Sequence, residues 1–304
     1  GPIGTERTLA LRNRFGAERV IACDRREGTS ELMESGPFQI LDATDARALE
    51  DTLEKHGVGQ LYLMAAMLSA TAEQFPSGAW ELNMNSLLQA LGLAREGKIS
   101  KLFWPSSIAV FGPSTPKENT PQSTITEPTT VYGISKLAGE GWCAYYQRKY
   151  GVDVRSVRYP GLISWKTQPG GGTTDYAVDI YRQALKTGNY ECFVNEGTRL
   201  PMMYMEDAIE GTLRLMEAPQ DQLTVRTSYN MGAMSFTPAQ MAESIRAHIP
   251  DFEISYAPDY RQEIADTWPE SINDARARED WGWNPRFGLN ETTKEMLDRL
   301  RDSL

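Results

Sequence analysis

Short apolar runs alternate with amphipathic stretches over the first 160 residues, and this alternation limits the possible folds more than any other feature. Apolar runs typical of strands lie at Arg19–Cys23, Phe38–Leu41, Gln60–Met64, Lys101–Trp104 and Val152–Val157. Helical periodicity separates them at 5–15, 45–56, 79–96 and 131–150. Because strands joined by crossover helices run parallel, the pattern predicts an α/β fold with a doubly wound parallel sheet.

The pattern changes after Pro160. A Gly-rich loop is expected at 161–172, and the Pro/Thr/Ser-rich stretch 113–130 also favours a loop. Further helices are expected at 173–187, 206–217, 237–248, 271–281 and 290–303, with strands at Thr224–Asn230 and near 253–256. This half therefore indicates a smaller lobe, set against the strand ends of the sheet.

Charge and rare residues exclude several functions. The chain has 31 Lys and Arg against 41 Asp and Glu, a net charge of −10, which disfavours nucleic acid or an anionic membrane as a partner. The sequence has two histidines and three scattered cysteines, so it offers few residues for zinc catalysis or for a Ser-His-Asp triad. No metal site is therefore expected. Without a signal-peptide pattern or a long apolar run, the sequence favours a cytoplasmic protein, or a matrix protein if the source is eukaryotic.

The first residues carry the pattern of a dinucleotide-binding turn. Gly1 and Gly4 precede a helical stretch, and Asp24 follows about 20 residues later, at the end of the first strand. Glycines allow the backbone to approach a pyrophosphate, and the carboxylate binds the ribose hydroxyls. We expect the strand and first glycine of this fingerprint to precede Gly1; the alternative is an ordinary glycine at a helix start. Asp24 favours NAD over NADP, whereas Arg25 and Arg26 weakly favour the reverse.

Tyr132-Gly133-Ile134-Ser135-Lys136 is a Y-x-x-x-K sequence at the start of a helix. Residues four apart share a helix face, so a cation lies beside the phenol. That cation is expected to lower the tyrosine pKa from about 10 towards the range of a usable base. Ser106 and Ser107 stand where a parallel strand ends, which is where α/β sheets bind ligands. Each motif alone is common; their joint order is much more specific.

With these motifs in place, the chain resembles the extended short-chain dehydrogenase/reductase family over nearly its whole length. The resemblance implies a Rossmann-type fold with an NAD-binding domain at 1–161, to which 206–230 returns, and a substrate lobe at 162–205 and 231–304. It implies Ser107, Tyr132 and Lys136 as the catalytic set. The implied cofactor contacts are Gly1, Ile3, Gly4, Asp24, Arg25, Asp42, Ala43, Ala65, Ala66, Asn83, Tyr132, Lys136, Tyr159, Gly161, Leu162 and Ile163.

Segments 160–164, 170–177 and 201–205 resemble the branch of that family that oxidises L-threonine. The resemblance implies a small-molecule substrate, L-threonine, and a homodimer built on the helices at 79–96 and 131–150. From local sequence alone, Thr173, Thr174 and Asp175 could equally be a helix cap. The substrate contacts that the resemblance implies are Ser69, Ser107, Tyr132, Thr173, Thr174, Asp175 and Trp268.

Two other functions stay open. A nucleotide-sugar 4-epimerase or dehydratase would share Ser, Tyr, Lys and NAD, but it must also bind a diphosphate. Residues 161–205 offer Lys166, Arg182, Lys186 and Arg199 for that purpose, without a clear clamp. The second is a non-catalytic dinucleotide-binding regulator, which would have no need of the base Tyr132.

Overall fold

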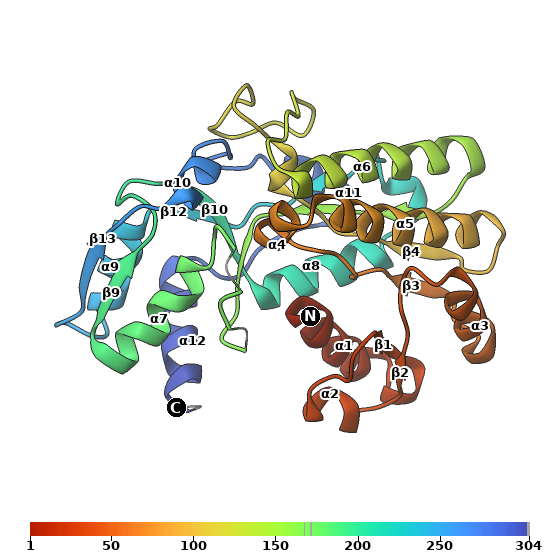
Figure 1. Ribbon diagram of the computed structural model, residues 1–304, viewed down its shortest axis with the longest axis horizontal. Coiled ribbons are helices and arrows are strands. Elements are labelled where there is room, and N and C mark those ends of the chain that lie inside the picture. The colour runs from red at the N-terminus through yellow and green to blue at the C-terminus, as the bar shows by residue number, and fades with distance from the viewer. Residues whose placement is uncertain (167, 171, 303–304) are drawn as a thin grey trace.

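The computed structural model describes residues 1–166, 168–170 and 172–302, and it has two lobes that lie side by side (Figure 1). The first lobe carries the long helices α5 (Pro76–Arg95) and α6 (Val131–Tyr150), which pack against each other. Its other helices are α1 (Pro2–Phe15), α2 (Ser30–Glu34), α3 (Ala46–His56), α4 (Ser69–Gln74) and α8 (Met205–Glu217). The second lobe holds α7 (Tyr176–Thr187), α9 (Pro238–Arg246), α10 (Tyr260–Ala265) and α12 (Leu289–Arg301).

The strands of the first lobe all pair in parallel, which confirms the α/β class. β1 (Ala22–Asp24) pairs with β2 (Phe38–Ile40). β4 (Lys101–Phe103) lies between β3 (Gln60–Tyr62) and β6 (Val154–Arg155). β7 (Val157–Tyr159) lies between β5 (Ser106–Ser107) and β11 (Tyr229–Asn230). Because parallel strands end at one edge, the residues after β1, β3, β5 and β7 are brought to the same side.

Two further small sheets were predicted only in part. β10 (Leu200–Tyr204) pairs in parallel with β8 (Gly161–Ile163) and antiparallel with β12 (Met234–Phe236). β9 (Asn189–Cys192) pairs in parallel with β13 (Glu253–Tyr256), where the sequence predicted a strand at 253–256. β8 lies inside the segment expected to be wholly loop, so the prediction for 161–172 was wrong at its start.

Capping explains why several helices match their predicted ranges. Thr130 precedes α6 and accepts from the amide of Gly133, and Gly151 ends the helix at a φ of 71°. Asp45 caps α3 in the same way, and Gly57 ends it at a φ of 60°. A side-chain acceptor at the start and a left-handed glycine at the end are strong boundary signals.

Other helix and strand boundaries differ from the predicted ones, and each difference has a structural reason. The helix predicted from 271 begins at Ala275, in α11 (Ala275–Trp281), because Ile272 forms a parallel bridge with Thr120. The strand predicted from 224 is reduced to β11, after a 3₁₀ turn at Gln220–Gln222. The run at 19–23 is also shorter, since a 3₁₀ turn at Ala17–Arg19 precedes β1.

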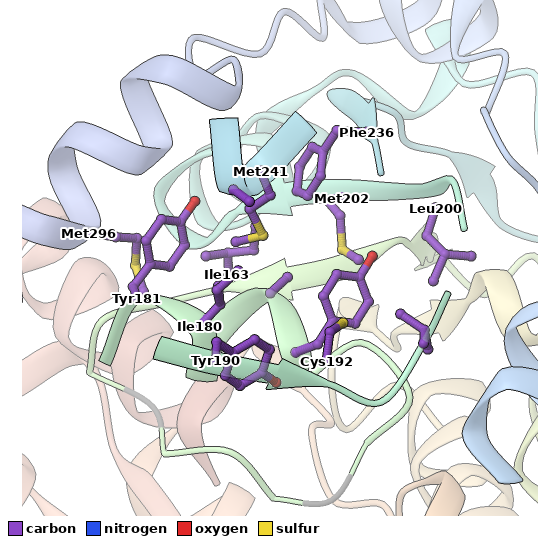
Figure 2. Packing of buried hydrophobic residues seen from close by; sticks show 14 of the residues in the cluster. Ile163, Ile180, Tyr181, Tyr190, Cys192, Leu200, Met202, Phe236, Met241 and Met296 are labelled. Atoms are coloured by element: carbon purple, nitrogen blue, oxygen red, sulfur yellow. The ribbon is translucent and has the colours of Figure 1, made fainter. Parts of the chain in front are cut away.

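Buried side chains form three clusters. One joins α5 to β4, through residues such as Leu87, Leu91 and Leu102. A second joins α8 to α1 and β7, and includes Trp281 at the end of α11 and Trp283 just beyond it. The third fills the second lobe, where Ile163, Tyr181, Met202 and Phe236 lie together (Figure 2). None of the helices in the described ranges is both long and apolar enough to cross a membrane.

Candidate active site

The strand end that bears Ser107 and the first turn of α6 lie against each other. Gly133 makes this approach possible, because a Cβ there would lie 2.2 Å from the carbonyl oxygen of Ala109 and 2.8 Å from Pro128. Ala109 belongs to the 3₁₀ turn η2 (Ile108–Val110) that follows Ser107. Glycine beside Tyr132 therefore places the phenol at the end of β5.

Tyr132 is half-buried and hydrogen-bonds with the side chain of Ser107. Burial raises the pKa of Tyr132 to about 12, and the hydrogen bond with Ser107 acts in the opposite sense. The predicted fall in the tyrosine pKa is therefore wrong for this structure, since burial outweighs the other influences. The phenol is the resting form of Tyr132 at neutral pH.

Lys136 is 2% exposed, one turn further along α6. Its Nζ atom donates to the carbonyl oxygen of Pro105 over 2.6 Å and lies 5.5 Å from the centre of the Tyr132 ring. Burial lowers the pKa of Lys136 to about 7, although its neighbours Cys143 and Glu140 act in the opposite sense. Ser107, Tyr132 and Lys136 are thus brought together as the sequence predicted.

The glycine turn and Asp24 also meet. The backbone nitrogen of Gly1 lies 3.5 Å from Oδ2 of Asp24, at the N-terminus of α1. Gly1 offers no side-chain cap, and the first turn of α1 has no acidic residue. A Cβ on Gly4 would come within 3.9 Å of Met64, so α1 packs closely on the chain after β3. Ile3 belongs to the same turn and is half-buried.

Further predicted cofactor contacts lie along the same edge. Arg25 and Asp42 follow β1 and β2, and Thr44 donates to the Asp42 carboxylate, which lowers the pKa of Asp42. Ala43, Ala65 and Ala66 are half-buried. Asn83 accepts from the amide of Met67 at 2.8 Å and donates to Ser135 at 3.1 Å. It therefore ties the loop of Ala65 and Ala66 to α6.

Tyr159 points its side chain into the core. Its hydroxyl accepts from Arg7 over 2.5 Å and contacts Thr212 on α8. Arg7, on α1, is 1% exposed, lies 4.8 Å from the centre of the Phe103 ring and also donates to Thr212. A cofactor contact by Tyr159 would thus have to use its backbone.

Gly161, Leu162 and Ile163 form β8, beside the segment predicted to bind substrate. A Cβ on Gly161 would lie 2.8 Å from Cγ2 of Thr174, so the predicted cofactor and substrate segments are in contact. Leu162 is half-buried, whereas Ile163 is fully buried in the second lobe.

The Thr173–Asp175 segment forms a turn rather than the predicted helix start. Asp175 accepts from the amides of Gly170 at 2.6 Å and Gly172 at 2.8 Å, and α7 begins at Tyr176. Thr173 is buried and Thr174 is half-buried. Ser69 begins α4, and its side chain lies outside the described part of the structure.

Two cavities lie in the second lobe. One, of about 440 Å³, is lined by Asp175 together with Asp179, Tyr190 and Arg261 among others. The other, of about 250 Å³, includes Trp268, which is 6% exposed. Ser107, Tyr132 and Lys136 line neither of them. Within the described ranges, His, Cys, Asp and Glu form no group that could hold a metal ion.

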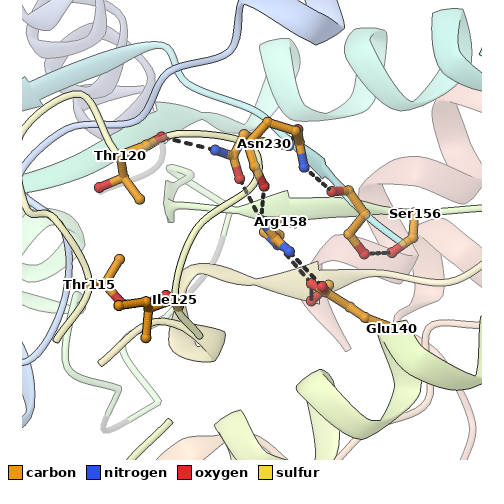
Figure 3. A network of polar contacts seen from close by, with 10 residues as sticks. Thr115, Thr120, Ile125, Glu140, Ser156, Arg158 and Asn230 are labelled. Atoms are coloured by element: carbon orange, nitrogen blue, oxygen red, sulfur yellow. Dashed lines mark hydrogen bonds and ion pairs between the residues drawn. The ribbon is translucent and has the colours of Figure 1, made fainter. Parts of the chain in front are cut away.

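The sequence missed a buried network around Glu140, Arg158 and Asn230 (Figure 3). Arg158 contacts the carboxylate of Glu140 with two nitrogens, at 2.8 and 2.7 Å. Glu140 stands four residues after Lys136, so the extended spacing Y-x-x-x-K-x-x-x-E was an available signal.

The sequence matches the NAD dependent epimerase/dehydratase family over residues 1–232. Among solved structures, it is similar to a GalE-like L-threonine dehydrogenase from Cupriavidus necator in its holo form, with 56% identity, coverage of 99% and 97% of the two chains and a TM-score of 0.96. It is also similar to L-threonine dehydrogenase from Clostridium difficile, at 48% identity, 100% and 95% coverage and a TM-score of 0.98. A monomeric L-threonine 3-dehydrogenase from a metagenome database matches at 48% identity, 100% and 97% coverage and a TM-score of 0.95.

Proposed function

The chain belongs to the NAD-dependent epimerase/dehydratase family, and on this premise we propose that it oxidises the C3 hydroxyl of L-threonine to 2-amino-3-oxobutanoate with NAD. The observation that carries the proposal is the contact of Ser107 and Tyr132 at a strand end, with Lys136 one turn away. The similarity to L-threonine dehydrogenases over almost the full length of both chains supports the substrate.

The residues at the start of α1 fit a dinucleotide. An uncapped helix N-terminus offers free amides to a pyrophosphate, and the nearby Asp24 carboxylate suits ribose hydroxyls. Gly1, Gly4 and Asp24 would hold these groups, and the carboxylate favours NAD over NADP. When bound, NAD supplies the acceptor for the hydride that leaves C3.

Each member of the catalytic set has a separate task. Tyr132 Oη removes the proton of the C3 hydroxyl, and the Ser107 hydroxyl hydrogen-bonds the same oxygen to hold it in place. While it is protonated, the Lys136 amine favours the phenolate that Tyr132 needs for this step, and because the pKa of Lys136 is lowered to about 7 this influence fades above neutral pH. Because burial raises the pKa of Tyr132 to about 12, the active form is a minor one at neutral pH.

A small zwitterion needs an anion near its ammonium and donors near its carboxylate. We assign these roles to Asp175, Thr173 and Thr174, since Thr174 contacts Gly161 at the cofactor segment. Ser69 and Trp268 remain proposed contacts, although Trp268 lines the other cavity of the second lobe.

Three of the four basic side chains at 161–205 have partners within the protein, which favours threonine over a nucleotide sugar. Lys166 pairs with Glu31, Arg182 donates to the carbonyl of Trp165, and Arg199 donates to the carbonyl of Ser235. These cations already have partners within the protein, so they are poorly placed to bind a diphosphate.

We also propose a homodimer that uses the outer faces of α5 and α6. Trp142, Tyr145 and Tyr150 of α6 form a cluster of edge-to-face rings, and these three side chains are 40, 37 and 42% exposed. Trp80 of α5 is 44% exposed. Large exposed aromatic groups are typical of interfaces. Trp142→Glu should shift the mass measured by light scattering from dimer to monomer, whereas Ile125→Glu, in the exposed loop before α6, should not.

Formation of NADH with L-threonine, L-serine, 3-hydroxybutyrate and UDP-glucose tests the activity. We expect the highest kcat/KM with L-threonine, and Tyr132→Phe should lower it by about a thousandfold because proton removal is lost. NADH binding by that variant, followed by fluorescence, serves as the folding control. Turnover of UDP-glucose in preference to threonine, or full activity of Tyr132→Phe, would contradict the proposal.

A further inference from the structure

Three consecutive residues at the strand end contact three residues on one face of α6. Tyr132, Lys136 and Glu140 are spaced four apart, so they project from the same side of the helix. The contacts are Lys136 with the carbonyl oxygen of Pro105 at 2.6 Å, Glu140 with the hydroxyl of Ser106 at 2.7 Å, and Tyr132 with the side chain of Ser107. The position of α6 along the strand end thus determines whether the Tyr132 phenol reaches Ser107.

Glu140 is the most strongly fixed of the three helix residues. Its Oε1 atom accepts both from Ser106 at 2.7 Å and from Arg158 Nε at 2.8 Å, while Oε2 accepts from Arg158 Nη2 at 2.7 Å. Ser106 and Arg158 are partners in the register of β5 and β7. The side chains of Glu140 and Arg158 are 2% and 6% exposed. A bidentate pair in such a buried place has a well-defined geometry.

Arg158 is held from its far side as well. Its Nη1 atom donates to Oδ1 of Asn230 on β11 and to the carbonyl oxygen of Gln122, both at 3.1 Å. Asn230 in turn donates to the carbonyl oxygen of Thr120 (Figure 3). It also donates to the carbonyl oxygen of Asn273. Groups from β5, β7 and β11 therefore all determine where the Glu140 carboxylate lies.

We propose that Glu140 is a positioning residue, which sets α6 against Pro105–Ser107 and so holds the Tyr132 phenol in contact with the Ser107 hydroxyl. This inference rests on the proposed function of that pair. Glu140 acts through Ser106 and Arg158 and does not itself touch the substrate. A displacement of about 1 Å at reacting groups lowers the rate by up to about a hundredfold, so even a small shift of α6 against Pro105–Ser107 should slow the reaction.

A second buried pair provides a matched control. Asp153 accepts from Arg155 Nε and Nη2, both at 2.8 Å, and Arg155 also donates to the carbonyl of Ala218 at 2.7 Å. The Arg155 side chain is 2% exposed. Arg155 lies on β6, which pairs with β4 and not with β5. Asp153→Asn therefore removes a buried ion pair in the same lobe without changing the contacts of Pro105–Ser107.

The experiment compares Glu140→Gln, Ser106→Ala, the double variant and Asp153→Asn. Ser106→Ala leaves the ion pair intact, so it keeps the test informative if Glu140→Gln folds poorly. We expect Glu140→Gln to lower kcat for L-threonine by at least about tenfold, with KM and the NADH dissociation constant little changed. Ser106→Ala should lower kcat in the same way. The kcat of the double variant should be no lower than that of Glu140→Gln, because both changes act on the same contact, between Ser106 and Glu140. Asp153→Asn should lower the melting temperature but leave kcat unchanged.

Glu140→Gln and Ser106→Ala with parental kcat and a reduced melting temperature, as in Asp153→Asn, would overturn the inference in favour of a purely structural role. A parent enzyme that is inactive on L-threonine would overturn the proposed function, and this inference with it. An active parent with fully active variants would overturn this inference alone.

Discussion

Lys136 donates to the carbonyl oxygen of Pro105, and this contact keeps its ammonium inside the protein, 4.5 Å from the centre of the Trp104 ring. An amine buried in such a place lowers the free energy of unfolding by an amount that depends on pH. Burial lowers the pKa of Lys136 to about 7, below its value of about 10.4 in an unfolded chain.

Lys136→Met should therefore stabilise the protein at pH 7 and lose most of that advantage near pH 10. Between the two pKa values the unfolded chain binds the proton that the folded protein releases, so the stability of the parent rises with pH. The change should be on the order of a few kcal/mol, since each pKa unit is worth about 1.4 kcal/mol. Urea unfolding of both proteins at the two pH values measures it. An equal stability difference at both values would show that the amine does not titrate in this range.

The rate should rise with pH from 7 to 10. Because the pKa of Tyr132 is raised to about 12, the phenolate fraction increases by up to about tenfold for each pH unit in this range. Initial rates of NADH formation at low concentrations of L-threonine give the profile of kcat/KM. A flat profile would mean that proton removal by Tyr132 does not limit the rate.

Asp24→Ala should relax the preference for NAD. The Asp24 side chain is 44% exposed beside the backbone of Gly1, where it would repel the 2′-phosphate of NADP. We expect the ratio of kcat/KM for NADP to that for NAD to rise by about tenfold, equivalent to about 1.4 kcal/mol. Asp51→Ala, an exposed carboxylate on α3, is the control and should leave the ratio unchanged. A parent enzyme that prefers NADP would refute the role of Asp24.

Asp175→Ala should raise the KM for L-threonine by about tenfold and that for NAD much less, because a charge-assisted contact to the substrate ammonium is lost. Asp179→Ala is the matched control, since Asp179 lines the same cavity from α7. If KM for NAD rises more than KM for threonine, Asp175 acts through the amides of Gly170 and Gly172 rather than on the substrate.

Local signals explain what could be predicted from the sequence. The ranges of α3 and α6 follow from Asp45, Gly57, Thr130 and Gly151, all of which act within one turn of the helix end. Ser107, Tyr132 and Lys136 were found because their motif lies on one strand end and one helix turn.

Features that depend on distant partners could not be predicted. The five residues of β10 are all buried, so the strand lacks the alternation that marks a half-buried one. The Glu140–Arg158 pair depends on the register between β5 and β7, which no local pattern specifies. The pKa of Tyr132 depends on its burial and not on its distance in sequence from Lys136.

Arg7 gives α1 a property that apolar packing alone would not provide. Its guanidinium donates in fixed directions to the hydroxyls of Tyr159 and Thr212, on β7 and α8. Apolar contacts resist the separation of a helix but oppose its rotation only weakly, whereas directional bonds to two other elements oppose rotation about the helix axis. Arg7 therefore sets the direction in which the first amides of α1 point, and with it the orientation in which a dinucleotide would be received.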